Sequence, residues 1–123
     1  MRLAFFCLFA AVNALAQSVP EKAACENAQS TAAMRECEGA RLARAEAAMK
    51  AAYDAAAAKL DQRGREKLRA AQSAWRRFRE AEAGFQADAA RDGTLAPLIA
   101  TSARAELTEA RARELEKAAG GTK

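Results

Sequence analysis

Cys25 and Cys37 are the residues whose type and spacing could carry the most specific chemistry in this chain. As free thiols they could act as nucleophiles or as metal ligands. Both follow a segment with the pattern of an export signal, and a thiol pair in an exported protein is expected to close into a disulfide. A disulfide supplies neither function, so we expect the pair to be structural. Closing a loop of about a dozen residues stabilises a fold by roughly 3 kcal/mol.

Residues 1–16 have the three parts of a cleavable secretory signal. A positive start is followed by the apolar run Leu3–Val12 and by Ala14-Leu15-Ala16, which is typical of a cleavage site. The run is too short to span a bilayer, which needs about 20 residues, so an uncleaved anchor is disfavoured. The residue before Cys7 is a phenylalanine and not the small residue of a lipoprotein signal, so we expect no lipid anchor. The sequence predicts a periplasmic or secreted protein whose mature chain begins at Gln17 and has no transmembrane segment.

Catalysis is not expected from the remaining residues. The chain has no histidine, which is the commonest general base and metal ligand. Its glycines do not form a phosphate-binding loop, and carboxylates such as Glu80 and Glu82 have no nucleophile paired with them. We therefore expect a protein that is not an enzyme and that uses no metal and no cofactor.

A basic stretch covers residues 63–77 and raises the question of a nucleic-acid partner. Export argues against this partner, and acidic residues share the same helices, so we expect a solvated surface and no nucleic acid. Attraction to anionic lipid head groups or cell-wall polymers is left open. Removing residues 1–16 takes away Arg2 and no acidic residue, so the formal net charge falls from +4 to +3.

Residues 30–119 are dominated by strong helix formers. Ser30 or Thr31 is expected to cap a first helix, and Asp61 is expected to cap a second helix. The first helix carries an apolar stripe that is expected to face the core. Its members are Met34, Cys37, Ala45, Met49, Ala52, Tyr53 and Ala56.

The second helix also carries apolar residues at spacings of three and four, which predicts a second core-facing stripe. Its members are Leu68, Ala71, Trp75, Phe78, Phe85 and Ala89. Residues 91–93 are expected to end this helix, with Gly93 in a left-handed conformation. Thr94 is expected to cap a third helix that has Pro97 in its first turn.

Three helices of about 25 residues joined by short turns pack most simply as an antiparallel bundle. We therefore predict an all-α domain over residues 30–119. An N-terminal arm, residues 17–29, precedes it and is tied to the first helix by the disulfide. The mature chain is long enough for one small domain and not for two.

Four blocks of residues resemble the lysozyme inhibitor LprI-like N-terminal family of small exported bacterial proteins. The matching residues are Cys25, Ala28, Ser30, Met34 and Cys37, then Glu46 and Tyr53, then Gln72, Trp75, Arg79 and Glu80, and finally Leu107, Thr108, Arg111, Glu114 and Leu115. The resemblance covers nearly the whole mature chain. It implies a helical, exported binding protein, with lysozyme inhibition as the activity of the family.

The chain departs from the family pattern at two positions that usually hold a second pair of cysteines. The corresponding residues are Ala83 and Ala103. If the two cysteines form a disulfide, they are expected to be lost together, because loss of one alone would leave a free thiol in an oxidising compartment. The usual glutamate after the first helix cap is also replaced, by Ala33, so the capping box is incomplete.

Most of the family-motif residues are expected to be structural. Trp75 and Arg79 could form a recognition surface, since Trp and Arg are common interface anchors. We favour a core Trp75 with Gln72 and Arg79 extending over it toward carboxylates. Arg111 and Glu114 could likewise form a site, but ion pairs between helices, with partners such as Glu46, are favoured.

The turn Asp61–Arg65 is the expected partner-binding element. Arg63 or Arg65 could pair with the two catalytic carboxylates of a lysozyme cleft. The expected partner is a lysozyme or another envelope protein, and the expected mechanism is occlusion of the lysozyme cleft. A rival hypothesis is a small envelope interaction or stress-related protein of the same fold without lysozyme activity.

Overall fold

The computed structural model describes residues 21–120, and every regular element in that range is a helix. The elements are α1 (Glu21–Glu26), α2 (Thr31–Ala58), α3 (Gln62–Ala87), the 3-10 turn η1 (Asp88–Ala90) and α4 (Ala96–Ala118). The predicted all-α class is confirmed. None of these helices is both long enough and apolar enough to cross a membrane.

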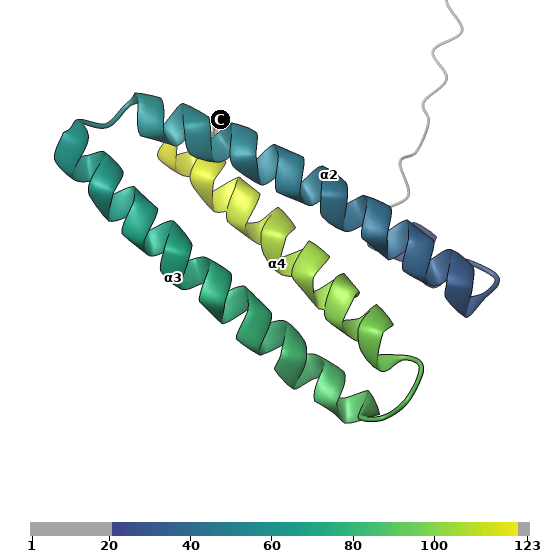
Figure 1. Ribbon diagram of the computed structural model, residues 1–123. Coiled ribbons are helices and arrows are strands. Elements are labelled where there is room, and N and C mark those ends of the chain that lie inside the picture. The colour runs from purple at the N-terminus through teal and green to yellow at the C-terminus, as the bar shows by residue number, and fades with distance from the viewer. Residues whose placement is uncertain (1–20, 121–123) are drawn as a thin grey trace, which may run out of the picture.

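Figure 1 shows how the three long helices are arranged. The chain reverses direction between α2 and α3 and again between α3 and α4. α4 packs on both of the other long helices, most extensively on α2. α2 and α3 meet each other at very few residues. α4 is therefore the element that joins the other two.

Two predicted helix caps are confirmed at the starts of α2 and α3. The Ser30 hydroxyl accepts a hydrogen bond from the amide of Ala33 at 3.1 Å, and the Asp61 carboxylate accepts one from the amide of Gly64 at 2.8 Å. Each bond satisfies an amide that has no partner within its own helix. Asp61 thereby fixes the point at which the chain turns into α3.

The predicted connection between α3 and α4 is wrong in its details. The left-handed residue is Asp92, with φ 62°, and not Gly93; aspartate is one of the residues that tolerate this conformation. The N-cap of α4 is Leu95, whose side chain makes no capping bond, and not Thr94. The amide of Ala96 bonds the carbonyl of Gly93 at 3.4 Å, so a turn leads directly into the helix past Thr94. Pro97 lies in the first turn of α4, as predicted.

The predicted N-terminal arm, residues 17–29, contains the short helix α1, which the sequence did not indicate. Cys25 of α1 is buried and forms the predicted disulfide with Cys37 of α2, with Cα atoms 5.4 Å apart. Lys22 forms an ion pair of 3.1 Å with Glu106 of α4. α1 is thus attached to α2 by the disulfide and to α4 by the ion pair. The predicted signal sequence, residues 1–16, lies outside the described residues.

The core lies mainly between α2 and α4 and is built from small side chains. Its buried apolar members on these two helices are Ala45, Met49, Ala52, Ala56, Ala103, Ala105, Ala112 and Leu115. Alanine allows two helix axes to approach closely, because interaxial distance depends on the side chains at the contact. Tyr53, Leu68 and Trp75 pack against this core and are only partly buried.

The apolar stripe predicted for α3 is wrong for its two phenylalanines. Phe78 is 52% exposed and Phe85 is 75% exposed, and Ala71 of the same stripe is exposed as well. α3 instead buries Gln72, Arg79 and Ala83, while Leu68 and Trp75 are partly buried against the core. The polar side chains of Gln72 and Arg79 can occupy core positions because α2 and α4 supply hydrogen-bonding partners for them.

Candidate functional site

Arg79 is the centre of a polar cluster that joins the three long helices. From α3, its guanidinium donates hydrogen bonds to the Glu46 carboxylate on α2 and, at 3.1 Å, to the Thr108 hydroxyl on α4. Its Cζ atom lies 5.3 Å from the centre of the Trp75 ring, a cation–π contact. As predicted, Arg79 lies over Trp75 and reaches a carboxylate, but the prediction of a core tryptophan is wrong, because Trp75 is only partly buried and Arg79 is the buried side chain.

Glu80 extends this cluster along the surface of α3. One of its oxygens accepts a hydrogen bond from Arg79 at 3.1 Å, and the other accepts one from Arg104 of α4 at 2.8 Å. The Arg104 bond, helped by the charges of both guanidinium groups, lowers the pKa of the Glu80 carboxyl. Glu80 is therefore stabilised as an anion between two cations.

Gln72 and Arg111 form a second polar contact between α3 and α4. The Arg111 Nε donates to the Gln72 amide oxygen at 3.0 Å, and the Gln72 nitrogen donates to the sulfur of Met49 at 3.3 Å. Arg111 also pairs with Glu114 on its own helix at 2.9 Å. The predicted ion pair between Arg111 and Glu46 is wrong, because the Glu46 carboxylate pairs with Arg79 of α3 and Arg111 pairs with Glu114.

The other family-motif residues lie at the same helix interfaces. Leu115 and Thr108 are buried, Leu107 is half-buried, and Tyr53 packs on the edge of the core. Arg79 is only 8% exposed. A partner protein could not reach its guanidinium, so a recognition surface has to use other residues.

One buried ion-pair cluster was not found by sequence reasoning. Arg41 on α2 donates two hydrogen bonds of 2.7 Å to the Glu109 carboxylate on α4 and one of 3.1 Å to Glu38. Ser102 donates to the other oxygen of Glu38 at 3.3 Å. The hydrogen bonds to Glu109 raise the pKa of Arg41 although burial opposes the shift. The signal in the sequence was the position of Arg41, which lies on the core-facing stripe between Cys37 and Ala45.

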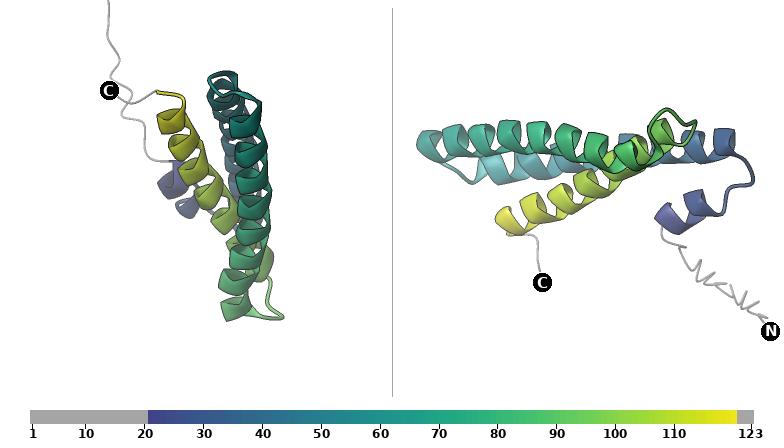
Figure 2. Two further views of the ribbon diagram at one scale, coloured as in Figure 1. Left: turned by 90° about the vertical axis from the view of Figure 1, so that its left-hand side faces the viewer. Right: turned by 90° about the horizontal axis from the view of Figure 1, so that it is seen from below.

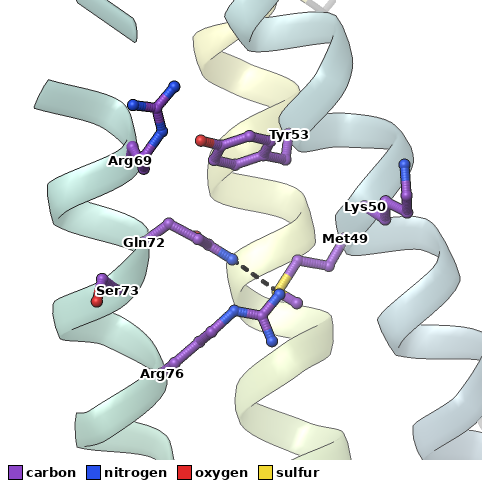
Figure 3. A pocket seen from close by; sticks show the side chains of 7 residues that line it. All are labelled: Met49, Lys50, Tyr53, Arg69, Gln72, Ser73 and Arg76. Carbon is purple, nitrogen blue, oxygen red and sulfur yellow. Dashed lines mark hydrogen bonds between the residues drawn. The ribbon is translucent and has the colours of Figure 1, made fainter. Parts of the chain in front are cut away.

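A groove of about 310 Å³ lies between α2 and α3, which meet each other at very few residues. Figure 3 shows it with α4 behind it. Tyr53 extends into it from α2, and the Gln72 and Arg76 side chains extend toward it from α3. The residues that line it are Met49, Lys50, Tyr53, Arg69, Gln72, Ser73 and Arg76.

The polar rim of this groove is cationic. Arg69 and Arg76 are exposed, and within residues 21–120 neither forms an ion pair or a side-chain hydrogen bond. Lys50 pairs with Asp54 at 2.8 Å, and this hydrogen bond raises the pKa of Lys50. The groove offers an aromatic ring and two unpaired guanidinium groups, which suits the binding of an anionic surface. The described part of the chain holds no cluster of three or more potential metal ligands from His, Cys, Asp and Glu.

The predicted binding residues Arg63 and Arg65 lie in the first turn of α3. The Arg65 Nε donates to the carbonyl of Ala57 at 3.1 Å, which ties it to the end of α2. Arg63 is exposed, and no described residue pairs with it. Figure 2, in its right-hand view, shows this α2–α3 end projecting beyond the end of α4. The structure thus places an unpaired cation at a projecting end of the molecule.

Comparison with known proteins identifies the family. A family model described as "Lysozyme inhibitor LprI" matches residues 22–115. The matched span contains both disulfide cysteines, all the motif residues and the projecting α2–α3 end. No curated protein and no solved structure gives a significant match.

Proposed function

Because the chain belongs to the lysozyme inhibitor LprI family, we propose that it is an exported, non-catalytic protein that binds a lysozyme and blocks its cleft. The observation that carries the proposal is the projecting α2–α3 end with the exposed, unpaired Arg63. The expected export signal in residues 1–16 would deliver the protein to the periplasm or the medium, where lysozymes act.

Charge and shape support insertion of this end into a lysozyme cleft. A glycosidase cleft contains two carboxyl groups that flank the scissile bond. A guanidinium can bind a carboxylate through two parallel hydrogen bonds, and these strengthen where water is excluded. Arg63 is the residue that we assign to this contact. Arg65 acts behind it, because its bond to Ala57 holds the turn in one conformation before binding and so reduces the entropy lost on association.

The overall charge of the inhibitor sets the expected salt dependence. The mature chain has a formal charge of +3, obtained from +4 by removal of Arg2, and many lysozymes are also basic. Two positive proteins gain no long-range attraction, so affinity has to come from contacts inside the cleft. Inhibition of a basic lysozyme is therefore expected to persist as salt rises from low to moderate concentration, because screening weakens the overall repulsion.

The test is a cell-wall lysis assay with the purified mature protein against a basic lysozyme and a goose-type lysozyme. We expect inhibition by the native protein and an inhibition constant at least about tenfold higher for Arg63→Glu, since a desolvated ion pair is replaced by a like-charge contact. Arg35→Glu is the matched control, because Arg35 is an exposed arginine at the opposite end of α2. An equal loss in both variants would reject Arg63 as the contact residue.

A second candidate function is a small envelope interaction or stress-related protein of the same fold without lysozyme activity. The exposed Phe78 and Phe85 favour it, because both lie on one face of α3 and an exposed apolar patch, unlike a single exposed residue, marks an interaction site. Absence of inhibition at micromolar excess, with both lysozymes and at both salt concentrations, would select this function over the first.

A further inference from the structure

The outer face of α3 carries an exposed apolar stripe. Phe78 and Phe85 are seven residues apart, and Ala71 lies seven residues before Phe78. Ala74 and Ala81 fall between them, so the spacings alternate between three and four. All five side chains are exposed. We call these five residues the α3 seam, and their spacing is the a/d repeat of a coiled coil.

We propose that the α3 seam is the contact between two copies of this chain, which pair through α3 as a parallel two-stranded coiled coil. Phe78 and Phe85 take a positions in this assignment, and Ala74 and Ala81 take d positions. Each phenylalanine would then pack against its own counterpart across a two-fold axis, with the small alanines allowing the helices to approach.

The charges beside the seam fit a second copy in the parallel orientation. Arg77 occupies a g position, and Glu82, five residues later, occupies an e position. In a parallel pair a g residue faces the e residue five positions on in the other helix, so Arg77 of each copy meets Glu82 of the other. Two equivalent ion pairs form. Antiparallel pairing would instead bring g positions near g positions and e positions near e positions, which offers no such match.

Both charged groups have capacity left for this contact. Arg77 uses one nitrogen, Nη1, in a hydrogen bond of 3.0 Å to Ser73. Glu82 uses one oxygen, Oε1, to accept from Gln86 at 3.1 Å. Among residues 21–120, neither side chain forms an ion pair, so pairing with a second copy breaks no existing salt bridge.

The seam is also accessible without disturbing the fold. The residues that α3 buries, such as Gln72, Arg79 and Ala83, lie on a different side of the helix from the seam. Figure 2, in its left-hand view, shows α3 running along one side of the molecule. A parallel pair would place the two α2–α3 ends next to each other. The inference stands whether or not the protein inhibits a lysozyme.

The first test is the molar mass of the mature, disulfide-intact protein by light scattering over a dilution series. We expect a dimer for the native protein and for the control Ala55→Glu, which changes an exposed alanine of α2. Phe85→Glu is expected to weaken dimerisation about thirtyfold or more, the factor that corresponds to an interface hot spot. Circular dichroism checks that each variant keeps its helices. A native protein that is monomeric throughout the series overturns the proposal. This holds even if Phe85→Glu abolishes binding to a lysozyme, because that result would assign Phe85 to a different contact.

The second test fixes the orientation of the two helices. In a parallel pair each d residue faces itself, so Ala74→Cys and Ala81→Cys should each give a disulfide-linked dimer under mild oxidation, whereas Ala55→Cys should not. Arg77→Glu should weaken the dimer, and the double variant Arg77→Glu/Glu82→Arg should restore it. Cross-linking at one of the two alanines alone, or no restoration by the charge exchange, overturns the parallel arrangement.

Discussion

Both carboxylate oxygens of Glu109 accept hydrogen bonds from the guanidinium of Arg41, each at 2.7 Å. This contact joins α2 to α4, and Arg41 is only 2% exposed. Glu38, which is also buried, shares the same guanidinium. The two carboxylates therefore share one cation. Removing this cation is expected to cost more stability than removing the cation of an ion pair on the surface.

Replacing Arg41 with alanine should lower the free energy of unfolding by about 3–5 kcal/mol, because it leaves the buried carboxylate of Glu38 and the partly buried carboxylate of Glu109 without their cation. Arg44→Ala is the matched control: Arg44 is exposed, and its ion pair with Glu21 should contribute less than about 1 kcal/mol. Urea unfolding at neutral pH measures both values. Similar losses for the two variants would show that the buried cluster is no stronger than a surface pair.

Removal of the disulfide should also lower stability. The double variant Cys25→Ser/Cys37→Ser is expected to lose about 3 kcal/mol, because the unfolded chain regains the entropy of an open loop. α2 should remain helical, since its cap at Ser30 does not involve either cysteine. Mass spectrometry of the unreduced mature protein should show two hydrogens fewer than after reduction. A free thiol in the unreduced, denatured protein would contradict the pairing.

Acid should weaken the contact between Glu80 and Arg104. The pKa of Glu80 is lower in the folded protein than its ordinary value of 4.5, so the unfolded chain binds the proton more readily. The resulting stabilisation is fully present above pH 4.5 and is lost as the pH falls through the folded-state pKa. Because Glu80 is half exposed, the effect is expected to be below about 1 kcal/mol.

Urea unfolding at about pH 7 and about pH 3 would measure this acid dependence. The native protein should lose more stability between the two values than Glu80→Gln, whose side chain does not ionise. Glu116→Gln serves as the control, since Glu116 is exposed and pairs with no described cation. If Glu80→Gln loses as much stability as the native protein, the Glu80 carboxylate does not contribute to the acid sensitivity.

Ala83 and Ala103 should accept a second disulfide. Both are buried, on α3 and α4 respectively, and we expect them to correspond to the positions of a second cysteine pair in the family. The double variant Ala83→Cys/Ala103→Cys should oxidise spontaneously and gain about 3 kcal/mol of stability, because the bond closes a loop of about twenty residues. Peptide mapping would identify the bond. Two free thiols in the oxidised, folded variant would show that the positions do not correspond.

Local features of the fold were predictable because they depend on neighbouring residues. The caps at Ser30 and Asp61 and the Cys25–Cys37 disulfide were all indicated by residue type and short-range spacing. The face that α3 buries was not predictable in this way. Its apolar residues Phe78 and Phe85 point outward, and the polar Gln72 and Arg79 point inward. Only the arrangement of α2 and α4 supplies the Glu46 carboxylate and the Arg111 guanidinium that those polar groups need.

The candidate site was predictable in part for the same reason. The turn between the first two long helices is visible in the sequence, and its two arginines, Arg63 and Arg65, were identified from it. The two arginines differ because the side chain of Arg65 bonds the carbonyl of Ala57, whereas Arg63 stays unpaired among the described residues. Residue spacing alone does not predict this bond. The groove between α2 and α3 arises because both helices pack on α4 and hardly on each other. The helix periodicities alone could not show that.

If the chain is exported as proposed, the central position of α4 has a consequence for how the protein reaches its final state. A translocated chain emerges with its N-terminus first, so the two cysteines, α2 and α3 all arrive before the helix that joins them. The Cys25–Cys37 bond can form early, because both partners lie near the leading end. The groove and the polar clusters of Arg79 and Arg41 cannot form until the last 23-residue helix has crossed and inserted between its neighbours. Completion of the molecule is therefore a late event that begins only when translocation is nearly finished.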